Sequence, residues 1–84
     1  MRVFYDKSIY AISRVDYNLE EKQLRLFFIH NQLYNDTIAD RIYVTCDSAS
    51  YVLKIVMFLL TRGYYDLNHP CVQKVEFIKI KGIV

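Results

Sequence analysis

The sequence predicts an α+β fold in which one apolar helix packs on one face of an antiparallel sheet of four to five strands. Several segments alternate apolar and polar residues with a period of two, which is the periodicity of a half-buried strand. One longer segment is apolar around most of its circumference and lies between helix-capping residues. The order of these segments predicts a meander of strands, then the helix, then a closing strand.

The meander consists of three alternating segments separated by polar loops at residues 18–22 and 31–36. These three strands are expected at Ile9–Tyr17, Gln23–His30 and Ile38–Cys46. The short segment Arg2–Tyr5 can add an edge strand, so the predicted sheet has four or five strands. If the first turn is centred between Leu19 and Glu20, Ile12 lies opposite Phe27, Tyr10 opposite Ile29, and Arg14 opposite Arg25.

The helix is expected between the N-cap oxygens of residues 47–50 and Gly63, a residue suited to the left-handed end of a helix. Its polar residues Ser50, Lys54 and Thr61 fall on one narrow stripe, so we expect burial on more than one side. Residues 64–70 are expected to form a loop.

The closing strand is expected at residues 72–80. Its apolar positions change parity between Phe77 and Ile78. This change predicts either a β-bulge or a strand with both faces partly covered.

Length and composition indicate a single domain, residues 1–84, with 54% hydrophobic residues. So short a chain buries a smaller share of its surface than a larger one, and its mean hydropathy of +0.07 is high. We therefore expect a homodimer or another protein partner. The net charge of +2 provides no bulk attraction to nucleic acid.

The N-terminus mixes charged and apolar residues and does not resemble a signal peptide. The most apolar run, residues 51–60, contains Lys54 and is too short to cross a membrane. A cytoplasmic location without a membrane partner is expected. The two cysteines, Cys46 and Cys71, are then expected to remain thiols.

Cys46 ends a strand directly before the helix, where a thiol pKa can be lowered. A phosphatase-type loop would need an Arg five residues later, and Val52 occupies that position. The alternative interpretation is a buried cysteine on the face of Ile42 and Val44, which is the commoner situation of a free cysteine.

Metal binding and acid–base catalysis lack the residue spacing that they require. Four residues have suitable side chains for a metal, but their spacing matches no zinc motif: His30, Cys46, His69 and Cys71. The acidic residues are scattered through turns and edges, and two glycines cannot build a phosphate-binding loop. We expect no catalytic residue, no metal, no cofactor and no small-molecule substrate.

The sheet face that points away from the helix is the predicted partner-binding site. It is expected to combine apolar, aromatic and arginine side chains: Tyr10, Ile12, Arg14, Arg25, Phe27, Ile29, Arg41 and Tyr43. Arg14 and Arg25, expected directly opposite each other, would repel unless acidic residues or an anionic partner offset their charges. An apolar patch of this size on a monomer is typical of an interface.

The predicted function is a small non-enzymatic protein-interaction module, homodimeric, such as an adaptor or inhibitor. The chain has many Phe, Tyr, Ile, Asn and Lys residues, whose codons are A/T-rich, and only two Gly and one Pro, whose codons are G/C-rich. This composition is typical of an A/T-rich bacterium or its virus. The alternative is a small single-stranded nucleic-acid-binding protein that uses the aromatic and arginine face. A third interpretation, in which the chain itself covers this face, leaves no site.

Overall fold

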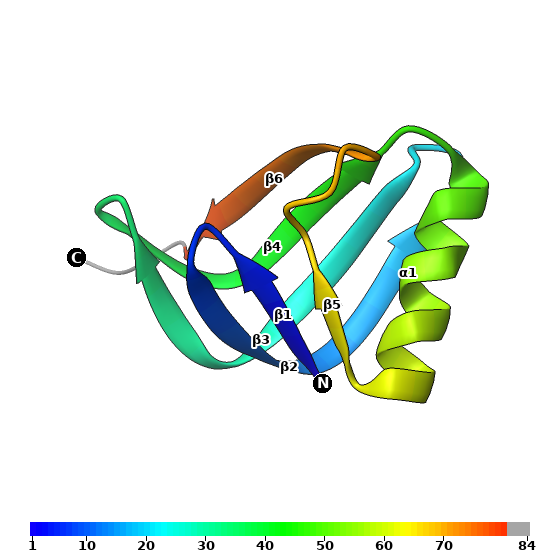
Figure 1. The fold of residues 1–84 in the computed structure, drawn as a ribbon. Coiled ribbons are helices and arrows are strands. Elements are labelled where there is room, and N and C mark those ends of the chain that lie inside the picture. Colours follow the sequence, from blue (N-terminus) through cyan, green and yellow to red (C-terminus); the bar gives the residue numbers. More distant parts are fainter. Residues whose placement is uncertain (81–84) are drawn as a thin grey trace.

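The computed structural model describes residues 1–80, which form one helix and a curled sheet of six strands (Figure 1). The elements follow one another as β1 (Arg2–Tyr5), β2 (Ser8–Asn18), β3 (Gln23–Tyr34), β4 (Thr37–Cys46), α1 (Ala49–Arg62), β5 (Tyr64–Asp66) and β6 (Val72–Lys79). Their order in the sheet is β5-β1-β2-β3-β4-β6. Helix α1 lies at one end of the sheet and contacts mainly β5 (Figure 1).

The α+β class and the sequence of meander, helix and closing strand are confirmed. The sheet has six strands and is mixed, because β5 pairs with β1 in parallel. This strand lies in the segment that was expected to be a loop. Strand β3 also extends beyond His30 to Tyr34, so that only a two-residue turn, Asn35 and Asp36, connects it to β4.

Both predicted ends of the helix are confirmed. At the N-cap, Ser48 Oγ accepts a hydrogen bond from the Tyr51 N–H at 3.2 Å. At the other end Gly63 has a φ of +83°, a conformation that side chains rarely adopt, and its N–H donates to Leu59 O at 3.1 Å. The capping residues therefore define where the helix begins and ends.

The core lies between the concave face of the sheet and one side of α1. The helix contributes Val52, Ile55 and Leu59, which are buried. The sheet and the loop after β5 contribute the remaining buried apolar residues: Val3, Tyr10, Ile12, Leu24, Leu26, Phe28, Ala39, Ile42, Val44, Cys46 and Leu67. Within residues 1–80 no polar or charged residue is buried in this core.

An aromatic cluster around Phe77 bridges β6 and the strands at the start of the chain. The rings of Tyr34 and Phe77 stack with centroids 4.1 Å apart, and Tyr5 and Tyr10 lie 6.2 and 5.5 Å from Phe77. Tyr34 donates its hydroxyl hydrogen to Asp6 Oδ2 at 2.9 Å. Phe77 and Ile78 are both half-buried, so both faces of β6 are partly covered, as one of the two predictions required.

Substituting a buried leucine of α1 will test which side of the helix stabilises the fold. Leu59 is 1% exposed and Leu60 is 71% exposed. We expect Leu59→Ala to lower the free energy of unfolding by about 2–5 kcal/mol, since it leaves a cavity in the core. Leu60→Ala should change it by less than about 0.5 kcal/mol. Urea denaturation followed by circular dichroism measures both, and equal losses would contradict this packing.

Candidate functional site

A β-bulge at Ser13 divides the predicted partner-binding face. Ile12 pairs with Phe28 and Arg14 pairs with Phe27, so Ser13 is one extra residue on β2. The Ser13 hydroxyl lies 3.2 Å from Phe27 O and 3.3 Å from Phe28 O and can donate to either carbonyl. An extra residue on one strand reverses which face the following side chains occupy.

Because of this bulge, Tyr10 and Ile12 point into the core, where they are 6% and 2% exposed. Tyr10 packs against Phe28 and Phe77, with ring centroids 5.5 Å apart in each pair. Placing these two residues on the outer face was therefore wrong. The alternation of β2 continues without interruption in the sequence, so the bulge is evident only from the strand pairing and the hydrogen bonds of Ser13 in the structure.

Six of the eight predicted residues do lie on the outer face. Three of them form one row across the strands, and the other three lie in adjacent rows. Arg14, Phe27 and Arg41 are paired side by side across β2, β3 and β4. Both guanidinium groups lie over the Phe27 ring, 4.0 Å from its centroid for Arg14 and 4.7 Å for Arg41.

The neighbouring row places Arg25 over the Tyr43 ring at 5.1 Å. We call this surface the arginine–aromatic face: Arg14, Arg25, Phe27, Arg41 and Tyr43. Ile29 lies on the same side of β3 and is 54% exposed.

Every arginine of this face has a carboxylate nearby. Arg14 Nη2 lies 3.5 Å from Asp16 Oδ2, and Arg25 Nη2 lies 3.6 Å from Glu21 Oε2. The predicted pairing of Arg14 with Arg25 is wrong by two positions, because the turn of residues 19–22 places Asp16 opposite Arg25. The face therefore does not need an anionic partner to relieve repulsion between arginines.

The third ion pair is the shortest of the three and has two hydrogen bonds. Arg41 donates from Nε and Nη2 to both carboxylate oxygens of Asp40, each at 3.0 Å. These hydrogen bonds lower the pKa of Asp40 and raise that of Arg41. Both side chains are about one-third exposed, so solvent screens the pair and it adds little stability.

The outward side of α1 presents a second surface, which the sequence signalled only as excess apolar residues. Leu53, Met57 and Leu60 follow the spacing i, i+4 and i+7, and are 43%, 63% and 71% exposed. We call these three residues the helical stripe. The helix is thus buried on one side only within the described chain, and the expectation of burial on further sides is not met by residues 1–80.

Cys46 is a core residue, as the alternative interpretation predicted. Its side chain is 0% exposed and lies in the same cluster as Ile42 and Val44. Burial raises the pKa of the Cys46 thiol to about 11, with a further contribution from Asp47. A position next to a helix N-terminus therefore does not activate this thiol.

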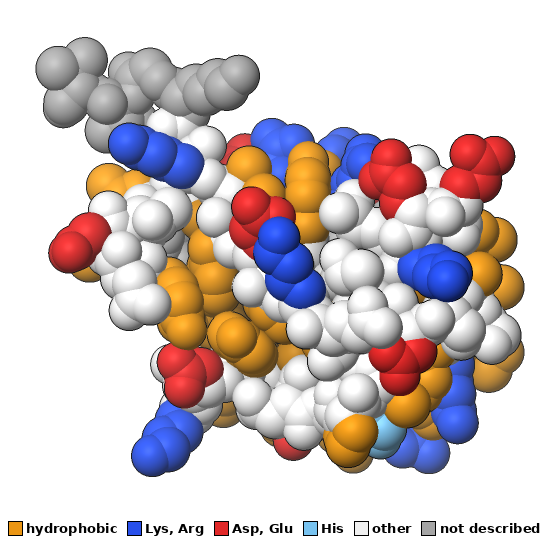
Figure 2. Space-filling model, turned by 90° about the horizontal axis from the view of Figure 1, so that it is seen from above, with side chains coloured by type: hydrophobic (Ala, Val, Ile, Leu, Met, Phe, Trp, Pro, Cys, Tyr) orange, Lys and Arg blue, Asp and Glu red, His pale blue; other side chains and the backbone are white. Residues whose placement is uncertain are grey.

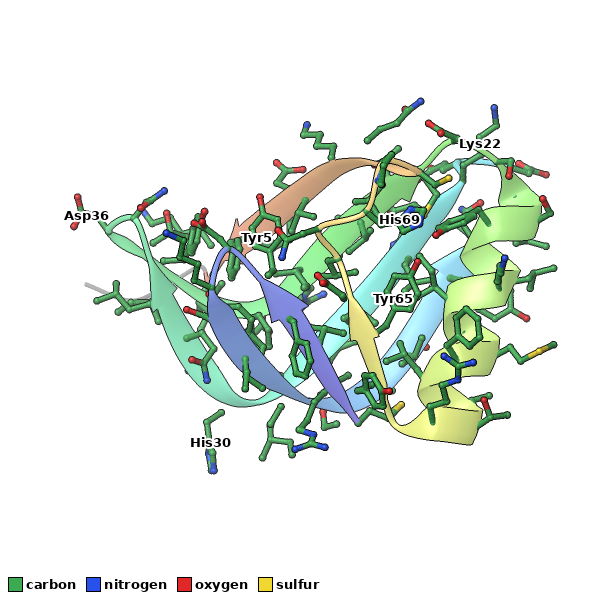
Figure 3. The ribbon with its side chains drawn as sticks, viewed as in Figure 1. Tyr5, Lys22, His30, Asp36, Tyr65 and His69 are labelled. Atoms are coloured by element: carbon green, nitrogen blue, oxygen red, sulfur yellow. The ribbon has the colours of Figure 1, made fainter. Side chains whose placement is uncertain are left out.

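The four candidate metal ligands do not converge. Figure 3 shows His30 on one side of the molecule and His69 on the other, beside the helix. Among residues 1–80 no group of three His, Cys, Asp or Glu side chains is placed to hold a metal ion. His69 Nδ1 instead accepts a hydrogen bond from the Cys71 N–H at 3.1 Å and lies 3.0 Å from Tyr51 Oη.

The Tyr51 hydroxyl that lies near His69 also hydrogen-bonds a second tyrosine. Tyr51 and Tyr65 share a short hydrogen bond between their hydroxyl groups. Burial, and then this bond, raise the pKa of Tyr65 above its usual value. The pair ties α1 to β5 and orients the loop of His69, which is a structural role that sequence reasoning missed.

Comparison with protein-family models, curated proteins and solved structures found no match for this chain. No helix in residues 1–80 is long and apolar enough to cross a membrane. The case for a function therefore depends on the two surfaces described above.

Alkylation will test the state of Cys46. A pKa of about 11 leaves only about one Cys46 thiol in ten thousand ionised at pH 7. We expect iodoacetamide to modify the half-buried Cys71 first and Cys46 only after unfolding. Peptide mass spectrometry measures both sites. Rapid modification of Cys46 in the folded protein at pH 7 would contradict its burial and revive the enzymatic interpretation.

Proposed function

We propose that this protein is a small non-enzymatic protein-interaction module that works as a homodimer and binds a second protein through the helical stripe. The observation behind the proposal is the exposure of Leu53, Met57 and Leu60 on the side of α1 opposite the core. Such a module would act as an adaptor or inhibitor by covering part of its partner. No chemical step is required of it.

The spacing of the helical stripe suits a helix that enters a groove on another protein. Anchors at i, i+4 and i+7 project from one side of a helix and can fill successive pockets. Half-buried Val56 extends the same apolar surface toward the core. Exposing three large apolar side chains next to one another is unfavourable for a free monomer, whereas a partner would remove them from water.

The charges of α1 indicate the chemistry of that partner. The helix contains no Asp or Glu and has two cations, Lys54 and Arg62. Lys54 is exposed, and the Arg62 guanidinium lies 4.4 Å from the Phe58 ring centroid. An apolar groove with acidic residues at its rim would be complementary to this surface.

The arginine–aromatic face supports a second candidate function, binding of single-stranded nucleic acid. Guanidinium groups and aromatic rings on an open sheet face are suited to stacking with bases. The carboxylates beside Arg14, Arg25 and Arg41 reduce the positive potential that phosphates would need. We therefore rank this function below protein binding.

Affinity capture with matched variants will test the helical stripe. Met57→Gln should weaken binding of a captured partner about fivefold or more, because an anchor residue contributes more than about 1 kcal/mol. Ile9→Gln is the control, since Ile9 is equally exposed, at 65%, but lies on β2. The partner captured by the wild-type chain is identified by mass spectrometry, purified and titrated against each variant by calorimetry.

Two results of this titration would contradict the proposal. Equal affinities for the wild type and Met57→Gln would show that the helical stripe is not the contact. An equal loss in the Ile9→Gln control would point to a different surface. Circular dichroism of each variant verifies that the fold is retained.

Titration with a fluorescent single-stranded oligonucleotide will test the second candidate. We expect no measurable binding at 150 mM salt and no steep dependence of affinity on salt, because the arginines already have acidic neighbours. Anisotropy measures both. Affinity that falls steeply with salt and is lost in Phe27→Ala would instead establish nucleic-acid binding by this face.

A further inference from the structure

Strand β6 lies at one edge of the sheet. It follows β4 in the strand order, and no strand within residues 1–80 pairs with its other side. It runs for eight residues, Val72–Lys79, without proline or glycine. An edge of this length offers a row of main-chain hydrogen-bonding groups to another strand.

The hydrogen bonds of β4 and β6 indicate which groups point outward. The Ile80 N–H donates to Ile38 O near the start of β4. Main-chain groups alternate sides along a strand, so those of Ile78 and Glu76 also point toward β4. Those of Val75 and Phe77 consequently point away from β4, toward the open edge.

The side chains beside Val75 have opposite charges. Lys74 and Glu76 are exposed and form a loose ion pair, with Nζ 3.8 Å from Oε1. In an antiparallel pair with its two-fold axis at Val75, Lys74 lies opposite Glu76 of the partner subunit, and the same contact occurs twice. Opposite charges directly across two strands are favourable.

We propose that the outer edge of β6 pairs antiparallel with the same edge of a second copy of this chain, with the two-fold axis at Val75. In this register the two Val75 residues exchange both main-chain hydrogen bonds. The arginine–aromatic face of each copy then becomes part of one continuous sheet surface. The helical stripe, on α1, remains available to a different protein.

Charge excludes the neighbouring registers. An axis at Glu76 would place each Glu76 opposite itself, and an axis at Lys74 would do the same for Lys74. An axis at Phe77 would place Glu76 opposite Ile78, which leaves the charges without partners across the seam. Among these registers, only the axis at Val75 combines hydrogen-bonded pairing with two opposite-charge contacts.

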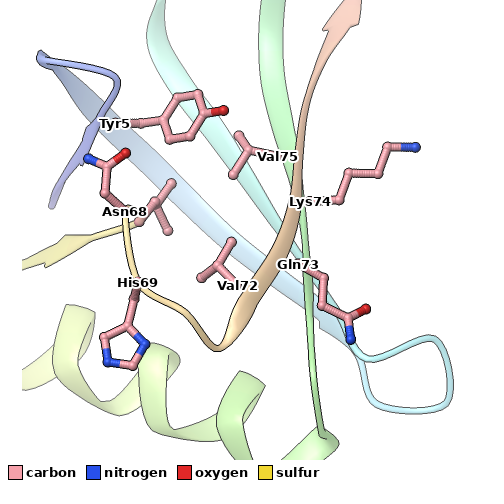
Figure 4. A pocket seen from close by; sticks show the side chains of 8 residues that line it. Tyr5, Asn68, His69, Val72, Gln73, Lys74 and Val75 are labelled. Carbon is pink, nitrogen blue, oxygen red and sulfur yellow. The ribbon is translucent and has the colours of Figure 1, made fainter.

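A hollow in the surface lies beside β6. Hydrophobic side chains lie at the bottom of a hollow flanked by charged side chains, on the side of the molecule that Figure 2 shows. A hollow of about 220 Å³ adjoins β6, where Tyr5 points from β1 toward Val75 and Asn68 lies nearby (Figure 4). An added strand along β6 would partly cover this hollow.

This inference rests on the homodimer of the proposed function and specifies its contact surface. Light scattering with size-exclusion chromatography at 1–100 μM determines the dissociation constant of the dimer. We expect Lys74→Glu to raise it about tenfold or more, since two attractive contacts become repulsive. Combining Lys74→Glu with Glu76→Lys should restore the wild-type value. The control Lys54→Glu makes the same charge change on α1 and should leave it unchanged.

Disulfide trapping tests the register independently. In a Cys71→Ser background, Val75→Cys should form a covalent dimer on oxidation, because hydrogen-bonded partners have Cα atoms about 5.5 Å apart. Glu76→Cys should not, since its two copies would be displaced along the strands beyond the reach of a disulfide, about 7 Å. Non-reducing electrophoresis measures both, and reduction must reverse the link.

The outcomes separate this inference from the proposed function. A wild-type dimer that is unaffected by Lys74→Glu and not trapped by Val75→Cys would overturn the β6 seam but leave the homodimer. A strictly monomeric wild type would overturn both statements about dimerisation. Binding of a partner to the helical stripe is measured separately and would survive either result.

Discussion

The extra residue at Ser13 is the constraint on which both surfaces of the sheet depend. Before it, Tyr10 and Ile12 point into the core; after it, Arg14 points outward and can stack on Phe27. Beside the bulge, the hydroxyl of Ser13 can donate to the main-chain carbonyl of Phe27 or of Phe28. A regular strand would bring either Arg14 into the core or Tyr10 into solvent, and both changes are costly.

The elements that were predicted well from the sequence are those determined by residues close together in the chain. Ser48 and Gly63 define the ends of α1 by capping and a left-handed conformation, and both act within one turn of the helix. The three meander strands follow from alternation over eight or more residues. Strand β5 was missed because its three residues depend on parallel pairing with β1, which is distant in sequence.

The predicted placement of the site residues was wrong where it depended on strand register. Six of its residues lie on the outer face, but the extra residue at Ser13 directs Tyr10 and Ile12 into the core. A two-position error in the turn misplaced the predicted pairing of β2 with β3. The same error created an apparent repulsion between Arg14 and Arg25. In the structure Asp16 faces Arg25, so the outer face is close to electrically balanced. This charge balance favours a protein over a nucleic acid as the binding partner of the outer face.

The pattern Lys74-Val75-Glu76 has a consequence for solubility as well as for pairing. An edge strand with only lysines repels every copy of itself, and an uncharged one pairs with any exposed strand. A lysine and a glutamate flanking a central valine are complementary only to an antiparallel strand with the same pattern in one register. Pairing with an unrelated strand, or with this strand in a shifted register, leaves Lys74 and Glu76 without opposite charges across the pair. Two side chains can therefore favour the correct second copy and also disfavour open-ended aggregation, since a two-fold pair leaves no further β6 edge exposed.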